Sequence, residues 1–521
     1  MIPASVATTE RLLEPIERWE RERPDELALR YLDRSWTWGE WAARIRQAAN
    51  ALIGEGLRRD DRVAVLDKNN AACLEVALAG VLAGTATVPV NHRLAAAEVA
   101  WIVNDAKARV LFVGAELLPL LEPVRGDLET VEKVIVVGGA ADEYEPWLAA
   151  ASAAPVAARG DVGDCFLQMY TSGTTGFPKG AMLTQRSLMA HTRAGVPTFG
   201  FDVDSVAMVA MPLFHVSGFS WALQCIAVGG VTIVVRDVVP ADILDALMRE
   251  RVTHAFFVPA VYQSFLAAPG VAERDYASLR CLGYGGSPIE RPLLERCLQV
   301  FEGVDFFQIY GMTELSGAFC VLGPAEHRDH TRPERLRSAG RPMPGGELRI
   351  LRRDRTPAAV GEIGEIAVRT ATAMAGYWEQ PEASAAVLRD GWLHTGDAGR
   401  LDHDGYLYIE DRVKDMFISG GENVYPAEVE RVIVELDPVL AAAVVGVPDE
   451  RWGEVGKAFV VARDGAMVTA DDVLEHCRGR LAGYKRPRSV EVVDDLPRNA
   501  TGKVLKHVLR APYWEGRERS I

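Results

Sequence analysis

The sequence predicts an α/β protein in which stacked parallel β-sheets are flanked by helices, because short apolar strands alternate with helical stretches. The clearest instance runs from an apolar strand at residues 63–66 through a helical stretch at 71–83 to a second strand at 86–90. The same alternation returns further along the chain, at 108–121, 131–137 and 205–257. With 521 residues the chain exceeds one ordinary core, so we expect at least two domains.

The last part of the chain has a different character and predicts a separate domain. A Gly- and Pro-rich segment at 340–346 opens a region of short strands, which continues to about residue 411. Beyond Arg412 the expected elements are fewer and end in a basic loop: a helix at 427–435, a strand at 441–447 and a helix at 470–481. We therefore place a large N-terminal domain at 1–411 and a small α+β domain at 412–521.

The charge balance limits the choice of partner. Acidic residues outnumber basic ones by 72 to 57, which gives a formal net charge of −15. Such a chain has no basic block to neutralise a nucleic-acid backbone, so we expect no nucleic-acid partner. An anionic ligand would have to be held by local lysines, arginines and backbone amides.

Cysteine use and the apolar runs predict a cytoplasmic protein. The seven cysteines are scattered, odd in number and without a CxxC pair, as expected for buried thiols in a reducing compartment. The N-terminus lacks the apolar core of a signal peptide. The longest uncharged apolar run, at 76–90, is broken by glycines and a proline and is too short to span a membrane.

One loop, at 170–180, combines glycines, hydroxyl groups and a lysine directly after an apolar strand. Its glycines let the backbone approach a ligand, its hydroxyls are donors, and Lys179 supplies a mobile cation for phosphates. It is not a Walker A loop, because glycine rather than Ser or Thr follows Lys179. Taken alone, such a turn is also typical of a plain connection.

Further motifs follow this loop in a fixed order. They are Met211-Pro212-Leu213-Phe214-His215, Tyr310-Gly311-Met312-Thr313-Glu314, His394-Thr395-Gly396-Asp397, Asp411-Arg412-Val413-Lys414-Asp415 and Pro497-Arg498-Asn499-Ala500-Thr501-Gly502-Lys503. Together with the loop they resemble the signature blocks of the adenylate-forming superfamily, which includes acyl- and aryl-CoA ligases, luciferases and the adenylation domains of peptide synthetases. The resemblance spans roughly residues 165 to 505.

The resemblance implies a two-step ligase. An acid is first converted by ATP and Mg²⁺ to an acyl adenylate, and the acyl group then passes to the thiol of coenzyme A. It also implies that the short strands before residue 411 form a small distorted β-barrel closing the large domain, and that the C-terminal domain is mobile about a hinge at Lys414.

The resemblance assigns catalytic and nucleotide-binding residues. Glu314 would bind Mg²⁺, and Lys503 would contact the substrate carboxylate and the phosphate oxygens. On residue type alone, Glu314 could cap a helix and Lys503 could be a solvated surface lysine. The remaining ATP- or AMP-binding positions are Thr171, Ser172, Gly173, Thr174, Thr175, Lys179, Gly285, Gly286, Ser287, Tyr310, Gly311, Met312, Thr313, Asp397 and Arg412, with Thr171 and His215 counted as catalytic as well.

For the acyl group and CoA the resemblance also names positions. The pocket positions are His215, Phe219, Tyr284, Gly285 and Ile309, and the CoA positions are Gly420, Gly421, Trp452 and Lys485. The pocket segments are apolar and hold no acidic partner for an ammonium group, which favours a neutral, hydrophobic acid over an amino acid. Ile309 stands where plant-type hydroxycinnamate ligases usually have glycine, so we favour a fatty, alicyclic or other aromatic acid.

Alternative functions share these motifs. A ligase that loads the acyl group onto a carrier protein would use the same channel for its pantetheine arm, and a luciferase would share the first step. A binding protein without catalysis is disfavoured by the joint presence of Glu314, Asp397 and Lys503. The sequence leaves peripheral membrane contact open, and does not separate a monomer from a homodimer.

Overall fold

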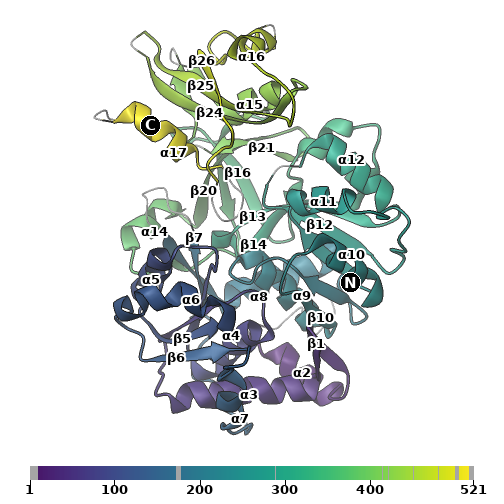
Figure 1. Ribbon diagram of the computed structural model, residues 1–521, viewed down its shortest axis with the longest axis vertical. Coiled ribbons are helices and arrows are strands. Elements are labelled where there is room, and N and C mark those ends of the chain that lie inside the picture. The colour runs from purple at the N-terminus through teal and green to yellow at the C-terminus, as the bar shows by residue number, and fades with distance from the viewer. Residues whose placement is uncertain are drawn as a thin grey trace. The chain divides into compact units, whose positions relative to one another are not determined.

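The computed structural model describes residues 10–171, 178–287, 289–412, 415–419, 422–449, 451–478, 480–498 and 504–515. The chain divides into two compact units (Figure 1). The first contains Met1–Glu347 and Arg369–Leu393, and the second contains Leu348–Val368 and His394–Ile521. The boundaries between the compact units therefore lie before residue 411. The boundary at 411/412 was predicted for a domain that moves about a hinge, and it stays a prediction.

A nine-stranded sheet in the first unit is parallel at its centre and antiparallel at its edges. Antiparallel pairing begins with β2 at one edge and with β14 and β15 at the other. Its strands, in spatial order, are β15 (Arg341–Pro342), β14 (Gly317–Leu322), β13 (Asp305–Met312), β12 (Cys281–Gly285), β11 (His254–Phe257), β9 (Val206–Val209), β10 (Val231–Val234), β1 (Leu27–Tyr31) and β2 (Arg34–Thr37).

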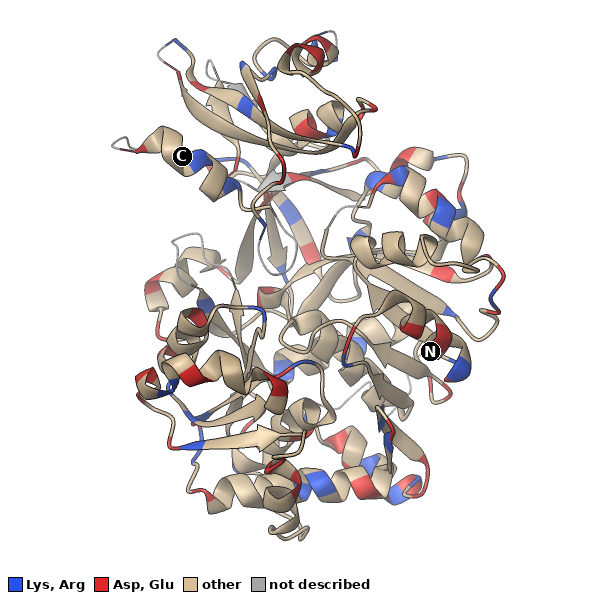
Figure 2. Cartoon of the chain, in the orientation of Figure 1, with Lys and Arg blue, Asp and Glu red and all other residues tan. Residues whose placement is uncertain are grey.

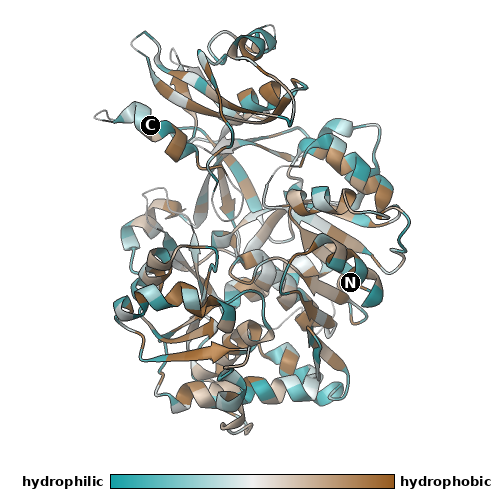
Figure 3. Cartoon of the chain, in the orientation of Figure 1, coloured by the Kyte–Doolittle hydropathy of each residue, from teal (hydrophilic) through white to brown (hydrophobic). Residues whose placement is uncertain are grey.

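A seven-stranded sheet in the same unit has five parallel strands and two antiparallel ones at one edge. Its strands, in order, are β18 (Gly376–Tyr377), β8 (Lys179–Thr184), β7 (Cys165–Thr171), β4 (Ala86–Val90), β3 (Arg62–Leu66), β5 (Ala108–Gly114) and β6 (Lys133–Val137). One core cluster joins residues of both sheets, such as Phe112 of β5 and Val209 of β9. The predicted stacked sheets are confirmed, and Figure 3 shows how apolar the strands β5 and β6 are.

Helices flank these sheets, as the strand and helix alternation predicts (Figure 1). The helix α4 (Ala71–Ala83) is apolar apart from Glu75 and all its residues are buried, which is typical of a helix inside the core. The others in this unit are α2 (Glu14–Glu22), α3 (Trp38–Gly54), α5 (Ala96–Asp105), α6 (Leu118–Leu121), α7 (Tyr144–Ala149), α8 (Gln185–Phe199), α9 (Val216–Val228), α10 (Pro240–Arg249), α11 (Pro259–Leu266), α12 (Arg291–Val300), α13 (Pro324–Arg328) and α14 (Pro381–Val387).

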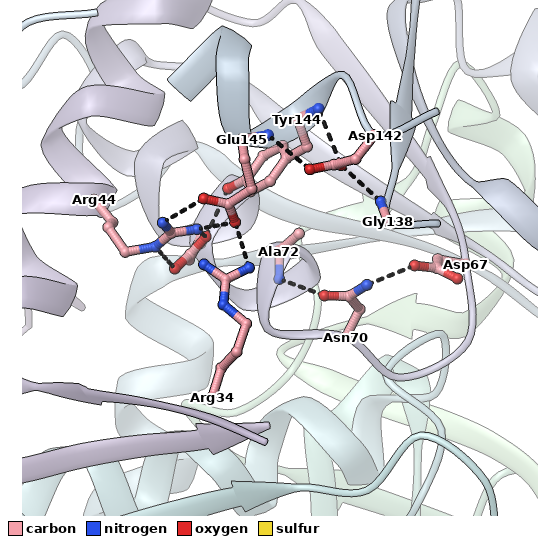
Figure 4. A network of polar contacts seen from close by, with 10 residues as sticks. Arg34, Arg44, Asp67, Asn70, Ala72, Gly138, Asp142, Tyr144 and Glu145 are labelled. Atoms are coloured by element: carbon pink, nitrogen blue, oxygen red, sulfur yellow. Dashed lines mark hydrogen bonds and ion pairs between the residues drawn. The ribbon is translucent and has the colours of Figure 1, made fainter. Parts of the chain in front are cut away.

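A buried ion-pair network fastens α3, α4 and α7 to one another (Figure 4). Glu75 of α4 is fully buried, and Arg44 of α3 donates to both of its carboxylate oxygens at 2.6 and 3.0 Å. The Tyr144 hydroxyl donates to Glu75 Oε2 at 2.7 Å, and Arg44 also pairs with Glu145. A buried carboxylate is tolerated only with such partners, so these contacts hold the three helices in register.

Two five-stranded sheets contain the strands of the second unit. The first sheet has the order β16 (Glu347–Leu351), β17 (Gly364–Arg369), β20 (Trp392–Leu401) and β19 (Leu388–Arg389), with β21 (Leu407–Arg412) paired to β20. The second has the order β23 (Glu422–Val424), β22 (Phe417–Ser419), β25 (Gly453–Ala462) and β24 (Val439–Asp449), with β26 (Ser489–Val492) paired to β25. Its helices are α15 (Pro426–Val434), α16 (Ala470–Cys477) and α17 (Lys506–Trp514).

The predicted α/β class, with a large sheet-based N-terminal part and a small C-terminal part, is confirmed. All seven cysteines are free, and every one except Cys165 is fully buried. Within the described ranges, no helix combines the length and apolarity needed to cross a membrane. Figure 2 shows acidic and basic residues mixed along the helices of the first unit.

Three buried histidines of the first unit make its stability depend on pH. Burial lowers the pKa of His191, His254 and His327 to about 4, from an ordinary value of 6.5. As the pH falls, these histidines take up protons in the unfolded chain at a higher pH than in the folded one. Their contribution to the free energy of unfolding is therefore fully present above about pH 6.5 and is lost as the pH falls toward 4. We expect each histidine to cost about 2 kcal/mol of unfolding free energy at pH 5.

Urea unfolding at pH 7, 6 and 5 measures this loss. A His327→Asn variant, which cannot titrate there, should show a shallower decline with pH whatever its stability at pH 7. An unfolding free energy that stays constant between pH 7 and 5 would contradict the assignment of neutral buried histidines.

Candidate active site

The predicted phosphate loop joins the two strands of a β-hairpin. Strands β7 and β8 pair antiparallel, with Thr171 directly opposite Lys179. Gly180 follows in β8, where a Cβ would lie 2.9 Å from Gln168 Nε2 and 3.2 Å from Tyr170 Cζ, so a larger residue would have to displace these side chains. The loop residues predicted to bind phosphate between these ends, Ser172, Gly173, Thr174 and Thr175, lie outside the described residues. The structure therefore presents Thr171 and Lys179 as the two ends of the loop.

Glu314 lies next to this hairpin. It occupies the short 3-10 helix Thr313–Leu315 that follows β13 and is 7 % exposed. Thr171 Oγ1 donates to Glu314 Oε1 at 3.5 Å, and the Tyr377 hydroxyl donates to the same oxygen at 2.9 Å. The structure thus brings together the hydroxyl and the carboxylate that the sequence assigned to catalysis and metal binding.

Tyr377 was not predicted from the sequence. It lies 63 residues from Glu314 along the chain and belongs to a strand of only two residues, so neither spacing nor periodicity connects it with the motif. Burial, and then the nearby Glu314 carboxylate, raise the pKa of Tyr377. The phenol therefore stays protonated and acts as a donor to Glu314 at neutral pH.

The predicted nucleotide wall is built by the ends of two neighbouring parallel strands. Gly285 ends β12 and pairs with Ile309 of β13, and a Cβ at Gly285 would lie 2.3 Å from the Ile309 carbonyl oxygen. Gly311 is equally constrained, because a Cβ there would lie 1.9 Å from the Gly317 carbonyl oxygen. The other predicted nucleotide-binding residues of these segments are Gly286 and Ser287, which follow β12, Tyr310 and Met312, which belong to β13, and Thr313, which follows it. Carboxyl ends of parallel strands are where open α/β sheets bind ligands.

His215 is the residue before α9 and packs on Phe214, with ring centroids 5.1 Å apart. Burial, followed by the positive charge of Arg93, lowers the pKa of His215 to about 4. The imidazole is therefore neutral at physiological pH. Phe219, one turn further along α9, is fully buried in the core cluster against which Ile309 packs.

Tyr284 and Ile309, both predicted to line the acyl pocket, pack against different core clusters. Successive side chains of a strand point to opposite faces, and Tyr284 is buried in a second core cluster, away from the cluster of Phe219 and Ile309. Its hydroxyl hydrogen-bonds His327 Nε2 at 2.9 Å. Gly283 is the residue that faces Ile309: a Cβ there would lie 3.1 Å from Ile309 Cδ1. The sequence prediction did not name Gly283, and the assignment of Tyr284 to the acyl pocket stays a prediction.

The remaining predicted positions belong to the second unit. Asp397 of β20 lies directly opposite Arg412 of β21, and Thr395 Oγ1 accepts a hydrogen bond from the Asp397 amide at 3.1 Å. Lys485 is ion-paired with Glu428 at 2.7 Å, and two arginines flank the ring of Trp452. Lys414, Gly420, Gly421 and Lys503 lie outside the described residues.

The donor set beside the hairpin suits a hard divalent cation. Glu314 supplies a carboxylate and Thr171 a hydroxyl, and oxygen ligands of this kind are those that Mg²⁺ prefers. Lys179 brings a cation to the same hairpin, as a phosphate chain requires. The residues present therefore fit both Mg²⁺ and the phosphates of a nucleotide.

Fold and site together define an adenylate-forming enzyme. Residues 16–378 match the AMP-binding enzyme family, and residues 428–503 match the AMP-binding enzyme C-terminal domain. The chain belongs to the AMP-binding enzyme family, and its resemblance to the acyl- and aryl-CoA synthetases of the adenylate-forming superfamily is confirmed.

The chain is similar over nearly its whole length to characterised ligases. A feruloyl-CoA synthase of Amycolatopsis sp is 41% identical over 506 residues, covering 95% of this chain and 97% of that protein. A fatty acid–[acyl-carrier-protein] ligase, ScoC, of Streptomyces coeruleorubidus is 36% identical and covers 94% of this chain and 93% of that protein. The solved structure of o-succinylbenzoate coenzyme A synthetase from Bacillus subtilis with ATP and magnesium has a TM-score of 0.84 at 31% identity, covering 95% of this chain and 98% of that one.

Proposed function

We propose that this protein activates a hydrophobic carboxylic acid with ATP and transfers the acyl group to coenzyme A, releasing AMP and pyrophosphate. The observation that carries this proposal is the hairpin end at Thr171 and Lys179 with the buried Glu314 carboxylate 3.5 Å from the Thr171 hydroxyl. A carboxylate becomes a good acyl donor only after its oxygen carries a leaving group, and an adenylate provides one. The site then has to orient the acid and neutralise phosphate charge.

The residues of the chain divide this work among them. Lys179, at the end of the loop, would neutralise the phosphate oxygens as pyrophosphate leaves. Glu314 and Thr171 would hold Mg²⁺, which supplies charge neutralisation at the phosphates. Neutral His215 would border the acid, and because it carries no positive charge it would not form an ion pair with the substrate carboxylate. Lys503, by the family resemblance, would bridge the acid and the phosphate during the first step.

The second unit would serve the nucleoside and the thiol. The two carboxylate oxygens of Asp397 can accept hydrogen bonds from both ribose hydroxyls. Arg412 of β21 is the residue paired with Asp397 of β20. We keep Gly420, Gly421, Trp452 and Lys485 as proposed CoA positions, with Lys485 already engaged by Glu428. A hinge at Lys414 would let one set of residues serve the first step and another the second.

The acid is proposed to be neutral and apolar beyond its carboxylate. The pocket positions His215, Phe219 and Ile309 present rings and a branched alkyl chain, and none of them can pair with an ammonium group. The Cδ1 atom of Ile309 fills the space beside Gly283. This contact supports a narrower or reshaped pocket than a glycine at 309 would leave, and hence a fatty, alicyclic or other aromatic acid.

Replacing Ile309 with glycine tests how the pocket selects its acid. The variant should gain about tenfold in the ratio of kcat/KM for ferulate to kcat/KM for a medium-chain fatty acid, because removed side-chain volume admits the bulkier ring. The KM for ATP should not change, and it controls for damage to the fold. A ratio that stays within twofold of the wild-type value would show that Ile309 does not shape the acyl pocket.

A carrier protein is the second candidate acceptor, because a relative with 36% identity loads one. The likeness to a CoA synthase with 41% identity favours CoA. We further infer a cytoplasmic enzyme, which the seven free cysteines support.

A single screen tests the proposed reaction and identifies the acceptor. Purified protein with ATP and Mg²⁺ would receive fatty, alicyclic, aromatic and amino acids, first with CoA and then with a pantetheinylated carrier protein. We expect mass spectrometry to find acyl-CoA from a hydrophobic acid. A thioester found only on the carrier protein would replace the proposed acceptor, and products from amino acids alone would contradict the proposed acid.

A further inference from the structure

Tyr377 contacts two of the groups assigned to the first step. Its hydroxyl donates to Glu314 Oε1 at 2.9 Å, and Lys179 Nζ lies 5.2 Å from the centre of its ring. The phenol thus bonds the candidate metal ligand while its face lies within reach of a cation–π interaction with the loop lysine. Tyr377 therefore links Glu314 to Lys179 through one side chain.

The tyrosine is held in this position by its backbone. Strand β18 has only two residues and pairs antiparallel with β8, with Tyr377 opposite Ala181. The amide of Trp378 donates to the Gly180 carbonyl at 2.8 Å, and the amide of Tyr377 donates to Ser384 Oγ at 2.8 Å. The pairing with β8 fixes the backbone of Tyr377 to the strand that carries Lys179, and the bond to Ser384 joins it to α14.

The neighbouring tryptophan fastens this short strand from the other side. The buried guanidinium of Arg62 lies 3.6 Å from the ring centre of Trp378, and Trp378 Nε1 donates to the Asp105 carbonyl at 3.0 Å. Arg62 also donates to Gln168 of β7 at 3.1 Å. Both strands of the hairpin are therefore tied to the segment that presents Tyr377.

The Tyr377 hydroxyl stabilises the buried Glu314 carboxylate. A carboxylate that is 7 % exposed needs hydrogen bonds to stay ionised and to keep one orientation. The Tyr377 hydroxyl occupies Oε1 at 2.9 Å, and the Thr171 hydroxyl reaches the same oxygen at 3.5 Å. Both bonds hold Oε1 in place and so restrict how the carboxylate can turn, as hydrogen-bonded partners orient the ligands of metal sites generally.

We propose that Tyr377 is a positioning residue for the first step: its hydroxyl orients the Glu314 carboxylate toward a divalent cation, and its ring face holds the Lys179 ammonium beside the phosphates. This role rests on the proposed function. It predicts that the hydroxyl and the ring contribute separately, the hydroxyl through the cation and the ring through the lysine.

Calorimetric titration of ATP, with and without Mg²⁺, separates these contributions. Tyr377→Phe keeps the ring and loses the hydroxyl, so ATP affinity without Mg²⁺ should stay within twofold of wild type, while the Mg²⁺-dependent gain should shrink about tenfold. Tyr377→Leu should in addition weaken ATP binding without Mg²⁺. In a Glu314→Gln background, Tyr377→Phe should change the Mg²⁺-dependent gain in ATP affinity less than twofold. The carboxylate through which the hydroxyl acts on the cation is already absent from that background.

Tyr144 offers a matched control. It is also a buried tyrosine that donates to a buried glutamate, with Tyr144 Oη 2.7 Å from Glu75 Oε2, but it belongs to the helix network of α3, α4 and α7. Tyr144→Phe should lower the melting temperature and leave both ATP affinities unchanged. A general loss of packing would instead affect ATP binding in both variants.

The outcomes decide the proposal. A full Mg²⁺-dependent gain in Tyr377→Phe would overturn the role of Tyr377 while leaving the proposed function intact. An equal loss with and without Mg²⁺, or an undiminished effect in the Glu314→Gln background, would overturn it as well, since the residue would then act on the fold. Failure of the wild-type protein to bind ATP would overturn the proposed function and this role with it.

Discussion

Replacing Lys503 with alanine is expected to slow acyl-adenylate formation by about a thousandfold. Negative charge builds up between the acid and the α-phosphate in this step, and the variant lacks the cation that would bridge the two groups and neutralise that charge. Thioester formation from a supplied acyl adenylate should fall by less than about fivefold, since the family resemblance assigns this lysine to the first step. Pyrophosphate exchange measures the first step, and thioester release from synthetic acyl adenylate measures the second.

Lys506 provides the control for this experiment. It lies in the same terminal segment, at the start of α17, and is ion-paired with Glu430 at 2.9 Å. Lys506→Ala removes the same type of side chain and should leave the ratio of the two rates unchanged. Equal losses of both half-reactions in Lys503→Ala would refute the assignment of this lysine to one step.

Replacing Glu314 with glutamine is expected to lower the rate of adenylate formation by about a hundredfold or more. The substitution keeps the size of the side chain and a carbonyl oxygen for the bonds from Tyr377 and Thr171, but it removes the negative charge that a divalent cation needs. Raising the Mg²⁺ concentration should recover part of the rate, because weakened binding can be offset by mass action.

The dependence of rate on Mg²⁺ concentration is the decisive curve for Glu314. We expect a shift of the half-maximal concentration to higher values in Glu314→Gln and an intermediate shift in Glu314→Asp, which keeps the charge on a shorter side chain. Superimposable curves for the wild type and Glu314→Gln would show that this carboxylate does not serve the metal.

Local patterns in the sequence predicted much of the fold. The strand, helix and strand at 63–90 could be predicted because buried parallel strands and a buried helix have continuous apolar runs. Asn70 and Gly84, which cap the helix, separate these runs from one another. Contacts between distant segments were not readable. Neither the pairing of β18 with β8 nor the stacking of Arg62 on Trp378 leaves a periodic signal in the chain.

The candidate site shows the same limit. The hairpin ends Thr171 and Lys179 and the nearby Glu314 were named from motifs, whereas Tyr377 was found only through its hydrogen bond. The motif around Tyr284 does not state which face of its strand the side chain occupies, because the faces alternate with every residue; the structure shows it buried in the second core cluster. By compactness, most residues of the short strands after residue 347 group with the C-terminal residues, because β17 pairs with β20 and β20 with β21; the domain boundary at 411/412 stays a prediction.

One measurement tests the central claim directly: incubation of the purified protein with ATP, Mg²⁺ and a library of hydrophobic acids, without any thiol acceptor, followed by mass analysis of the enzyme-bound products. The account predicts an acyl adenylate and one equivalent of pyrophosphate with at least one acid. Recovery of unreacted ATP and acid across the whole library, from protein that binds ATP, would contradict it.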